Sequence, residues 1–519
     1  MRQGRRTIFR NGLIVDGTRA AAFVGDIVME SERIVSVDKP SGSNDAFYAA
    51  NAEVIDCTGC VVAPGFIDAH SHSDLQILQN RTEKLLQGVT SEVVGNCGFS
   101  AYPASKDPEA LRRFANGIFC GGEDWGWDSA HDYLSDAERC EAATIVSLVG
   151  HGALRISVAG DTSRPLTALE LDRMCEQLDR SLEEGAVGFS SGLMYAPGSG
   201  ASGAELTALA SVAASKGAIY TTHMRSYSAG LVDAVEEQLE IARASGCRLQ
   251  ISHLQAAGEE YWPMQQRAID AIERANAGGV DVSFDAYPWL AGSTVMTQIL
   301  PQWALDGGLD KLLARLSDSD QRDRIRPHIQ PEAHWDGVVV TSTAKDEGSL
   351  VGRSIAQLAA ERGGTPEDTV MDLLIEQEGQ VNIVEHSQSR ENLHALLTHP
   401  LATVVTDGVY TRGRSHPRLY ATYPLLLGEL VRERKWMSLE DAIYKVTARP
   451  ANQFRIKDRG KLAAGYKGDI TVFDPSAIHT DATYEVPDVP PVGIKSVWRN
   501  GERLVSEGVV TRFAGGATP

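Results

Sequence analysis

The stretch GFIDAHSHSD, residues 65–74, ends an apolar run with two histidines, His70 and His72. In an extended chain, residues two apart point to the same face. The two imidazoles therefore aim together at whatever lies above the end of the predicted strand. Such a pair is also found on surface turns, so the rest of the chain has to decide between the two interpretations.

Seven more apolar segments of β type follow, and helix-patterned segments separate them. Together with residues 61–70 they cover 89–98, 143–152, 185–193, 217–224, 248–254, 280–287 and 402–408. Near-continuous apolar strands that alternate with helices are typical of a parallel sheet covered on both faces. Eight such units predict an α/β protein with a (β/α)8 barrel.

The two ends of the chain have a different pattern. Residues 1–60 and 456–519 contain short strands of alternating apolar and polar residues with turn signals between them. We expect one small β-sandwich built from both termini, and a barrel domain over 61–455. The seventh and eighth strands are too far apart for one connection, which predicts an inserted lobe at 288–350 over the barrel mouth.

Composition limits the possible partners. The chain has 519 residues, with 49 Lys and Arg against 69 Asp and Glu, so the formal charge of −20 argues against nucleic acid and anionic membranes. No apolar stretch approaches the roughly 20 residues that span a bilayer, and no secretory signal is apparent. Seven cysteines fit a reducing compartment. We expect a cytoplasmic protein with a small-molecule substrate, while the oligomeric state stays open.

The ends of the predicted barrel strands carry residues that can bind a metal. After the two histidines of the first strand come Cys97, His223, His253 and Asp407. This face of a barrel is where active sites are built. A single buried histidine is more often a core residue than a ligand, but six metal-competent groups at strand ends are hard to explain that way.

Imidazole, thiolate and carboxylate are together ligands of zinc type. Zinc lowers the pKa of its bound water to about 7. Asp407, at the end of the eighth strand, would hold that water, take its proton and pass it to the leaving group.

The order of motifs resembles a known family over nearly the whole chain. The motifs are GFIDAHSHSD, EVVGNCGFS, SSGLMYAPG, YTTHMRS, ISHLQAAG, DAYPW, TDG and HPRLYATYP, followed by RGKLAAGYKGDITVFDP. They resemble the amidohydrolase superfamily in its D-aminoacylase (N-acyl-D-amino-acid deacylase) branch. The resemblance implies a metal-dependent TIM barrel that cleaves a linear amide, N-acyl-D-amino acid, into a carboxylate and a D-amino acid.

The resemblance also implies roles for the six residues. It assigns a tight zinc to Cys97, His223 and His253, and a second, weaker metal position that shares the thiolate to His70, His72 and Asp407. Many amidohydrolases bridge two metals with a carboxylated lysine on strand four. Here no lysine lies between positions 106 and 216, so Cys97 is the substitute and a hydantoinase or dihydroorotase is disfavoured.

The carboxylate of an N-acyl amino acid needs hydrogen-bond donors or cations. The resemblance assigns Tyr195 to it, although packing at a turn explains this residue equally well. Arg225 could clamp the carboxylate or pair with a neighbouring acid, and Ser293 could donate to it. His151 could line the pocket or cap the barrel interior. Family members commonly carry a lysine where this chain has Gln255, two residues after the strand-six histidine.

The loss of that lysine favours a neutral or larger amide, unless Arg412 or Arg414 supplies the charge. His416 is a further candidate near the mouth, as a partner of a ligand or as a residue that orders a loop. Two other functions stay open: hydrolysis of another C–N bond (a cyclic imide, a dipeptide or a xenobiotic amide), and a non-catalytic barrel scaffold. The intact set of six groups argues against the scaffold.

Overall fold

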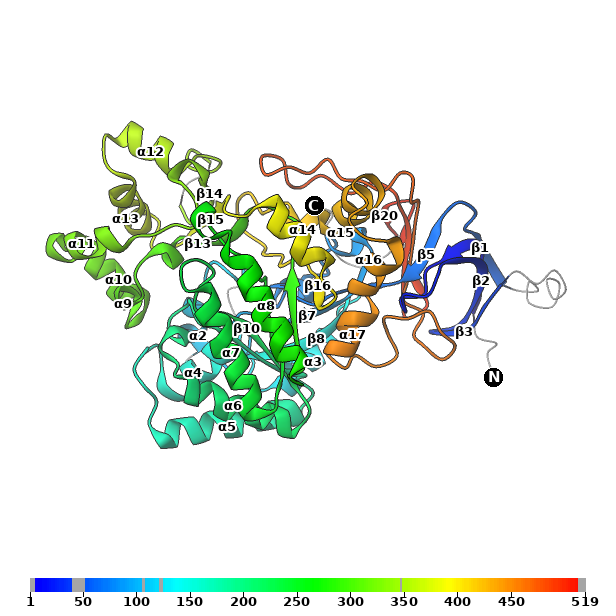
Figure 1. Cartoon of the computed structure of the whole chain (residues 1–519), viewed down its shortest axis with the longest axis horizontal. Helices are drawn as coiled ribbons and strands as arrows, with labels where there is room; N and C mark the ends of the chain where they lie inside the picture. The colour runs from blue at the N-terminus through cyan, green and yellow to red at the C-terminus, as the bar shows by residue number, and fades with distance from the viewer. Residues whose placement is uncertain (1–4, 40–51, 105–107, 121–124, 346–347, 512–519) are drawn as a thin grey trace.

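The computed structural model describes residues 5–39, 52–104, 108–120, 125–345 and 348–511 (Figure 1). Parts of the predicted terminal segments, at 1–4, 40–51 and 512–519, lie outside the described residues. A barrel stands between a sheet built from both ends of the chain and a lobe on the opposite side (Figure 1).

The barrel contains eight parallel strands whose order in the sheet is their order in the chain. They are β6 (Phe66–Asp68), β7 (Val89–Val94), β8 (Thr144–Gly150), β9 (Gly188–Gly192), β10 (Ile219–His223), β11 (Arg248–Ile251), β12 (Val282–Ala286) and β16 (Ala402–Val404). Beyond the ends of the first and last strands, a parallel bridge joins Ser71 to Gly408 and nearly closes the barrel. Every predicted barrel segment contains one of these strands, which confirms the predicted fold class.

Helices cover the outside of the barrel, as the alternating pattern predicts. They are α2 (Pro108–Phe114), α3 (Ala130–Ala137), α4 (His151–Ala159), α5 (Ala168–Glu183), α6 (Gly203–Ser215), α7 (Leu231–Ser245), α8 (Met264–Ala277) and α14 (Arg390–Thr398). Helix α5 shows why they form: a capping box of Thr167 and Glu170 satisfies its first N–H groups, and Met174 and Leu178 face the core one turn apart. None of the described helices is both long enough and apolar enough to cross a membrane.

Strands from both ends of the chain form one nine-stranded sheet. They are β1 (Arg6–Ile14), β2 (Phe23–Glu30), β3 (Arg33–Asp38), β4 (Ala52–Asp56), β5 (Val61–Pro64), β17 (Ile470–Phe473), β18 (Ile494–Arg499), β19 (Glu502–Ser506) and β20 (Val509–Val510). Strand β5 pairs with β1 and β17 and so joins the two ends. The rings of Phe9 and Trp498 pack edge to face in its core, 5.3 Å apart. Helices α15 (Arg418–Leu425), α16 (Leu439–Lys445) and α17 (Ala448–Gln453) lead from the barrel back to this sheet.

The chain crosses from this sheet into the barrel at Gly65, the first residue of the stretch GFIDAHSHSD. The predicted segment 61–70 is therefore two strands, β5 and β6, that belong to different sheets. A Cβ atom on Gly65 would lie 2.2 Å from Thr90 Oγ1. Only glycine allows so close an approach of the two chain segments.

The lobe follows strand β12 and has a sheet and a core of its own. It contains β13 (Gly292–Val295), α9 (Gln302–Leu305), α10 (Gly308–Ser317), α11 (Ser319–Ile325), β14 (Val338–Thr343), α12 (Ile355–Arg362), α13 (Pro366–Glu376) and β15 (Val381–Glu385). Strand β15 lies between β13 and β14 and pairs antiparallel with both. The lobe therefore runs past the predicted end at residue 350, because its central strand, β15, comes last in sequence among its three strands.

Candidate metal centre and substrate cavity

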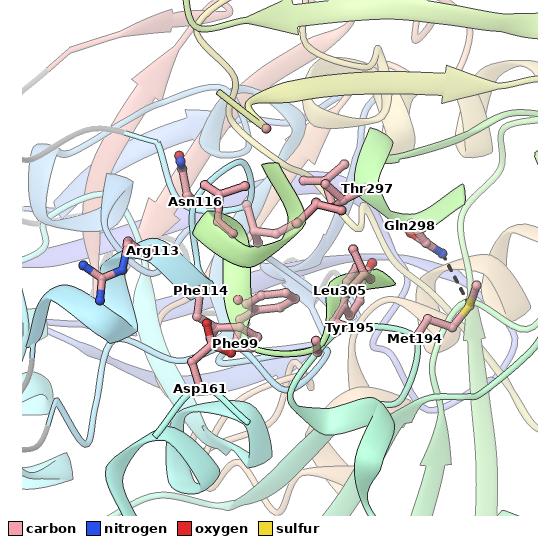
Figure 2. Close-up of a pocket in the computed structure, with 17 residues that line it drawn as sticks. Phe99, Arg113, Phe114, Asn116, Asp161, Met194, Tyr195, Thr297, Gln298 and Leu305 are labelled. Atoms are coloured by element: carbon pink, nitrogen blue, oxygen red, sulfur yellow. Dashed lines mark hydrogen bonds between the residues drawn. The ribbon is translucent and has the colours of Figure 1, made fainter. Parts of the chain in front are cut away.

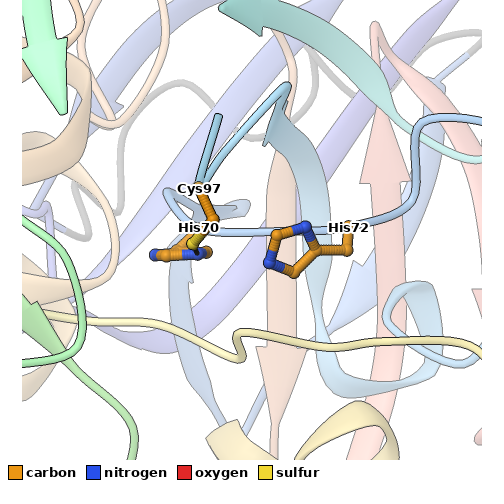
Figure 3. Close-up of side chains that lie close together, drawn as sticks. All are labelled: His70, His72 and Cys97. Carbon is orange, nitrogen blue, oxygen red and sulfur yellow. Dashed lines mark hydrogen bonds between the residues drawn. The ribbon is translucent and has the colours of Figure 1, made fainter. Parts of the chain in front are cut away.

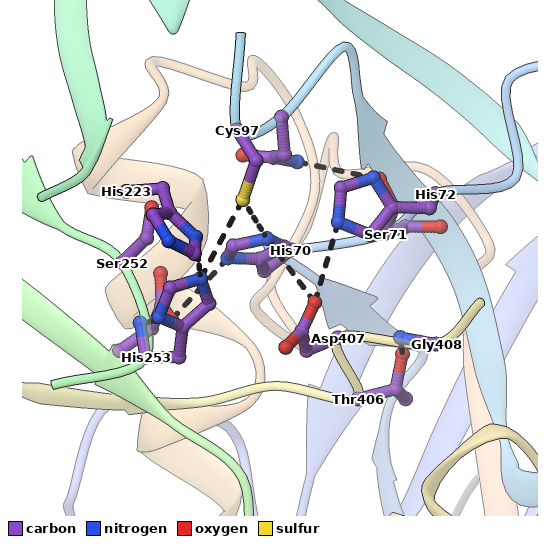
Figure 4. Close-up of polar contacts among 12 residues, drawn as sticks. His70, Ser71, His72, Cys97, His223, Ser252, His253, Thr406, Asp407 and Gly408 are labelled. Atoms are coloured by element: carbon purple, nitrogen blue, oxygen red, sulfur yellow. Dashed lines mark hydrogen bonds and ion pairs between the residues drawn. The ribbon is translucent and has the colours of Figure 1, made fainter. Parts of the chain in front are cut away.

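The six predicted metal-binding residues meet at the carboxyl ends of the barrel strands (Figure 4). Each of them is at most 6% exposed. They come from five strands: His70 and His72 follow β6, Cys97 follows β7, His223 ends β10, His253 follows β11 and Asp407 follows β16. Segments that are far apart in the sequence thus supply one buried cluster.

The distances within the cluster suit a single ion or an adjacent pair of ions. Cys97 Sγ lies 3.2 Å from His70 Nε2 and 3.5 Å from His253 Nε2. His223 Nδ1 lies 3.1 Å from His253 Nε2. Ligands that surround one zinc at its usual bond lengths are roughly 3–4 Å apart. The donor atoms therefore have the spacing and the chemistry of a zinc site.

Three sets of three residues each bring their ligand atoms within 4.8 Å of one another. The first is His70, His72 and Cys97 (Figure 3). The other two are Cys97 with His223 and His253, and His70 with His253 and Asp407. Cys97 belongs to both the early and the late histidine groups, which is the position a bridging thiolate requires.

Asp285, at the end of strand β12, lies behind two of these histidines, and sequence analysis missed it. Its Oδ1 accepts the backbone N–H of His253 at 2.6 Å and lies 3.4 Å from His70 Nδ1. Gln250 Nε2 donates to the other oxygen at 2.7 Å. A carboxylate at the outer nitrogen of a metal-binding histidine fixes the ring and its tautomer. The signal was available, since Asp285 is another acid at the end of a barrel strand.

Asp407 contacts both the histidines and a buried cation. Its Oδ1 is 3.3 Å from His70 Nε2 and 3.3 Å from His72 Nε2, and its Oδ2 is 2.9 Å from Arg418 Nη1. Burial alone would raise the pKa of the Asp407 carboxyl, but Arg418 and His70 outweigh it and hold that pKa well below its usual value. Asp407 is therefore ionised at neutral pH.

Arg418 is the cation that sequence analysis missed, although it lies in the quoted HPR motif. It is 1% exposed, and its guanidinium lies over the ring of Tyr287, 4.7 Å from the centroid. Sequence analysis suggested Arg412 or Arg414 as the source of this charge, but neither lines the cavity that His223, His253 and Asp407 share. Arg412 is exposed, and the Arg414 backbone N–H donates to the carbonyl of Thr341.

Three of the six residues have a left-handed backbone. The φ angles of Cys97, His253 and Asp407 are 55°, 33° and 49°. Such angles cost residues other than glycine about 1 kcal/mol or more, and they cluster at functional sites. The strain turns each chain segment at the strand end, where the side chain reaches the cluster.

A cavity above the cluster extends to the lobe, and three of the predicted substrate-binding residues line it: Tyr195, Gln255 and Ser293. The ring of Tyr195 packs 4.8 Å from that of His223. Gln255 Oε1 accepts a hydrogen bond from the Tyr287 hydroxyl at 3.1 Å. Two carboxylates from the lobe, Glu332 and Glu385, also line this cavity and had no sequence signal.

Two other predicted substrate-binding residues lie outside the cavity. His151 begins helix α4, and its Nε2 lies 2.8 Å from Glu205 Oε1. Arg225 pairs with Glu237 at 2.9 Å and donates to two loop carbonyls. Of its two expected roles, this is the pairing with a neighbouring acid. His416 donates from Nε2 to the carbonyl of Ala291 at 3.0 Å and orders that loop.

A second cavity adjoins the first between the barrel and the lobe (Figure 2). Tyr195, Gln298 and Ile118 line both cavities. Its other walls include six large apolar side chains, from Phe99, Phe114, Met194, Leu305, Leu309 and Leu312, together with the polar side chains of Arg113, Asn116 and Asp161. An apolar part of a substrate can therefore lie beside the metal cluster.

Comparison with known proteins places this geometry in context. A model of the amidohydrolase family matches residues 53–505. N-acyl-D-glutamate deacylase of Alcaligenes xylosoxydans xylosoxydans is 32% identical over 496 residues, which are 95% of this chain and 92% of that protein. D-aminoacylase of the same organism is 31% identical over 509 residues, 97% of this chain and 95% of the relative.

Solved structures agree with these relatives. N-acyl-D-glutamate deacylase from Bordetella bronchiseptica, complexed with zinc and a phosphonate mimic of the tetrahedral intermediate, superposes with a TM-score of 0.82 at 30% identity. The match covers 97% of this chain and 96% of that chain. A crystal structure of D-aminoacylase has the same TM-score at 31% identity and covers 97% of both chains.

Proposed function

The chain belongs to the amidohydrolase family, and on that premise we propose that it is a zinc-dependent hydrolase of a linear amide, an N-acyl-D-amino acid or a close analogue. The products would be a carboxylate and a D-amino acid. One observation carries the proposal: imidazole, thiolate and carboxylate groups from five barrel strands lie within ligand distance of one another beneath a cavity. The relatives named for the deacylation of N-acyl-D-glutamate and for D-aminoacylase activity support the substrate class.

Cys97, His223 and His253 would hold the tight zinc, and His70, His72 and Asp407 would shape a second, weaker position that shares the Cys97 thiolate. The first set fits, because its donor atoms are buried and lie within 4.8 Å of one another. At the second position, His70 and His72 form such a set with Cys97, and Asp407 Oδ1 lies 3.3 Å from Nε2 of each histidine. A D-aminoacylase of solved structure, 31% identical to this chain, has a binuclear metal centre with one-metal activation and second-metal attenuation. A bound zinc supplies a Lewis acid that polarises the amide carbonyl and acidifies water.

Asp407 has the position and charge of the general base and acid. Its Oδ1 faces the two histidines of the H-x-H pair, so it can accept a hydrogen bond from the attacking water and take its proton. Arg418 holds the opposite oxygen, which fixes the plane of the carboxylate. Asp407 then returns the proton to the nitrogen of the leaving amine.

Neutral groups orient the substrate beside the metal. Burial raises the pKa of the Tyr195 hydroxyl, which therefore stays protonated and can donate a hydrogen bond. The Gln255 amide also faces this cavity as a neutral donor and acceptor. Gln255 is the observation that favours the second candidate function, hydrolysis of a different C–N bond such as that of a cyclic imide or a xenobiotic amide, because Gln255 adds no charge to anchor a simple carboxylate.

The test combines metal analysis with a substrate screen. Purified protein is chelated, reloaded with zinc and assayed on N-acyl-D and N-acyl-L amino acids, dipeptides and cyclic imides. Hydrolysis of a linear N-acyl-D compound that is lost on chelation and restored by zinc would support the proposal. Hydrolysis of cyclic imides alone would replace it with the second candidate, and neither metal binding nor turnover would leave a non-catalytic scaffold.

A further inference from the structure

The charged groups that line the cavity indicate which charge the substrate carries. We infer that the substrate carries a cationic group, an ammonium or a guanidinium, and that Glu332 and Glu385 bind it. The inference rests on the proposed function, since it assigns a substrate class to the same cavity.

The inserted lobe holds the two carboxylates together. Glu385 ends strand β15, and Glu332 lies in the loop between helix α11 and strand β14. The backbone N–H of Glu332 donates to Glu385 Oε1 at 3.2 Å. Both residues line the cavity that His223 and Asp407 line from the barrel side. An amide bond at the metal cluster and a charged group at the lobe can therefore belong to one molecule.

Neither carboxyl group has a cationic partner among the described residues. Within the described part of the chain, no Lys or Arg forms an ion pair with Glu332 or Glu385, although Glu385 is only 4% exposed. Arg418 is the one described lysine or arginine among the cavity residues, and it is paired with Asp407 at 2.9 Å. A buried carboxylate without a cation is costly, and a cationic ligand removes that cost.

The protonation of the pair agrees with this arrangement. Burial raises the pKa of Glu332 to about 7 and that of Glu385 to about 8, and the charge of Glu332 adds to the rise at Glu385. A cation between them would lower both values and favour the doubly ionised form. Glu332 and Glu385 would therefore lose protons and become negatively charged when a positive group enters the cavity.

Anionic side chains fit this cavity poorly. Asp407 would repel a second carboxylate, Glu332 and Glu385 would repel it whenever they are ionised, and Gln255 supplies no compensating charge. The two sources of a cation remain distinct: it can be on the amine half of the substrate, as in a basic D-amino acid, or on the acyl half, as the free ammonium of an aminoacyl group.

Matched substrate pairs separate these sources. N-acetyl-D-arginine and N-acetyl-D-citrulline differ in the charge of the amine half, and glycyl-D-leucine and N-acetyl-D-leucine differ by one ammonium on the acyl half. With zinc-loaded enzyme, we expect kcat/KM of the cationic member of one pair to exceed that of its neutral partner by about 10- to 100-fold, the range for a hydrogen bond to a charged group.

The Glu385→Gln variant should lose most of that preference, and the double variant with Glu332→Gln should lose all of it. Glu361→Gln is the matched control, because it removes the same charge from an exposed position in helix α12 of the same lobe. The control should keep the preference of the natural protein. Equal kcat/KM within both pairs, or a preference that survives Glu385→Gln, would overturn the inference.

Calorimetric binding tests the site independently of turnover. D-arginine against D-citrulline, and glycinamide against acetamide, should show a preference for the cation that Glu385→Gln removes. If no amide is hydrolysed, the proposed function fails and these binding curves alone decide the inference. Binding of Ca²⁺ or Mg²⁺ that depends on Glu385, with no preference among the organic ligands, would identify a metal site instead and overturn it.

Discussion

Asp407→Asn separates catalysis from folding, since asparagine keeps the shape of the side chain and removes its charge. The variant loses the group that accepts and returns the proton. Proton transfer by a positioned side chain contributes about 10²- to 10⁴-fold, so we expect kcat to fall by that factor. Zinc should remain at one ion per chain, because Cys97, His223 and His253 form a complete set without Asp407.

The same substitution has a stability cost that follows from Arg418. That guanidinium is 1% exposed and would lose the partner that now lies 2.9 Å away. Removing one member of a buried ion pair costs about 3–5 kcal/mol. An unfolding entropy of about 2.1 cal/mol/K per residue gives roughly 1.1 kcal/mol/K if all 519 residues unfold together. The melting temperature should therefore fall by about 3–5 °C.

Steady-state kinetics, zinc content and calorimetric melting measure the three effects on one preparation. Asp469→Asn is the matched control, since Asp469 is 4% exposed and pairs with Arg459 in the terminal sheet, away from the cavity. It should lower the melting temperature similarly and leave kcat unchanged. If Asp407→Asn kept kcat within tenfold of the natural protein, or if it lost all its zinc, Asp407 would not have the assigned role.

Three further changes test the other parts of the site. Cys97→Ser should lose the tight zinc and all turnover, because a hydroxyl is a poorer zinc ligand than a thiolate; full zinc occupancy in this variant would contradict the assignment. Gln255→Lys adds a cation to the cavity and should raise kcat/KM for N-acetyl-D-glutamate relative to N-acetyl-D-glutamine by about tenfold, whereas an unchanged ratio would mean that position 255 does not contact the substrate side chain. Raising the pH from 6 to 9 ionises Glu332 and Glu385, whose pKa values are about 7 and 8, so the kcat/KM ratio of N-acetyl-D-arginine to N-acetyl-D-citrulline should increase; a flat ratio would show that these carboxyls do not bind the guanidinium. Ionisation of the water at the metal affects both substrates and cancels in that ratio.

Periodicity predicted the barrel because its strands are buried on both faces and its helices on one. Strands buried on both faces are nearly continuous apolar runs, and helices buried on one face have apolar residues at helical spacing, so both can be recognised in the local sequence. The terminal sheet could be predicted only as strands, since the pairing of β1 with β5 and of β5 with β17 depends on contacts between the two ends of the chain. The lobe was predicted too short for the same reason: β15 lies at the centre of its sheet, but the pairing that shows this is not local.

The proximity of the candidate metal ligands could be predicted because each of them stands at a strand end, and a barrel brings the carboxyl ends of its strands to one face. The residues that line the rest of the cavity could not be predicted from the sequence. Glu332 and Glu385 line the cavity above the cluster only because the lobe lies beside the barrel mouth. For His151 the sequence left two positions open, the pocket wall or the barrel interior. His151 follows strand β8 directly but already begins a helix, and its Nε2 lies 2.8 Å from Glu205 Oε1.

The strained backbone shows how the fold and the site depend on each other. Cys97, His253 and Asp407 have φ angles that favour glycine, yet glycine has no ligand atom to offer. Other parts of the site stabilise two of them: Asp285 accepts the N–H of His253, and the carbonyl of His70 accepts the N–H of Asp407. Residues of the site therefore hold one another in place through the main chain. This explains why residues of low local propensity occur at the strand ends of an otherwise regular barrel, and why local sequence rules predict the strands better than the turns that follow them.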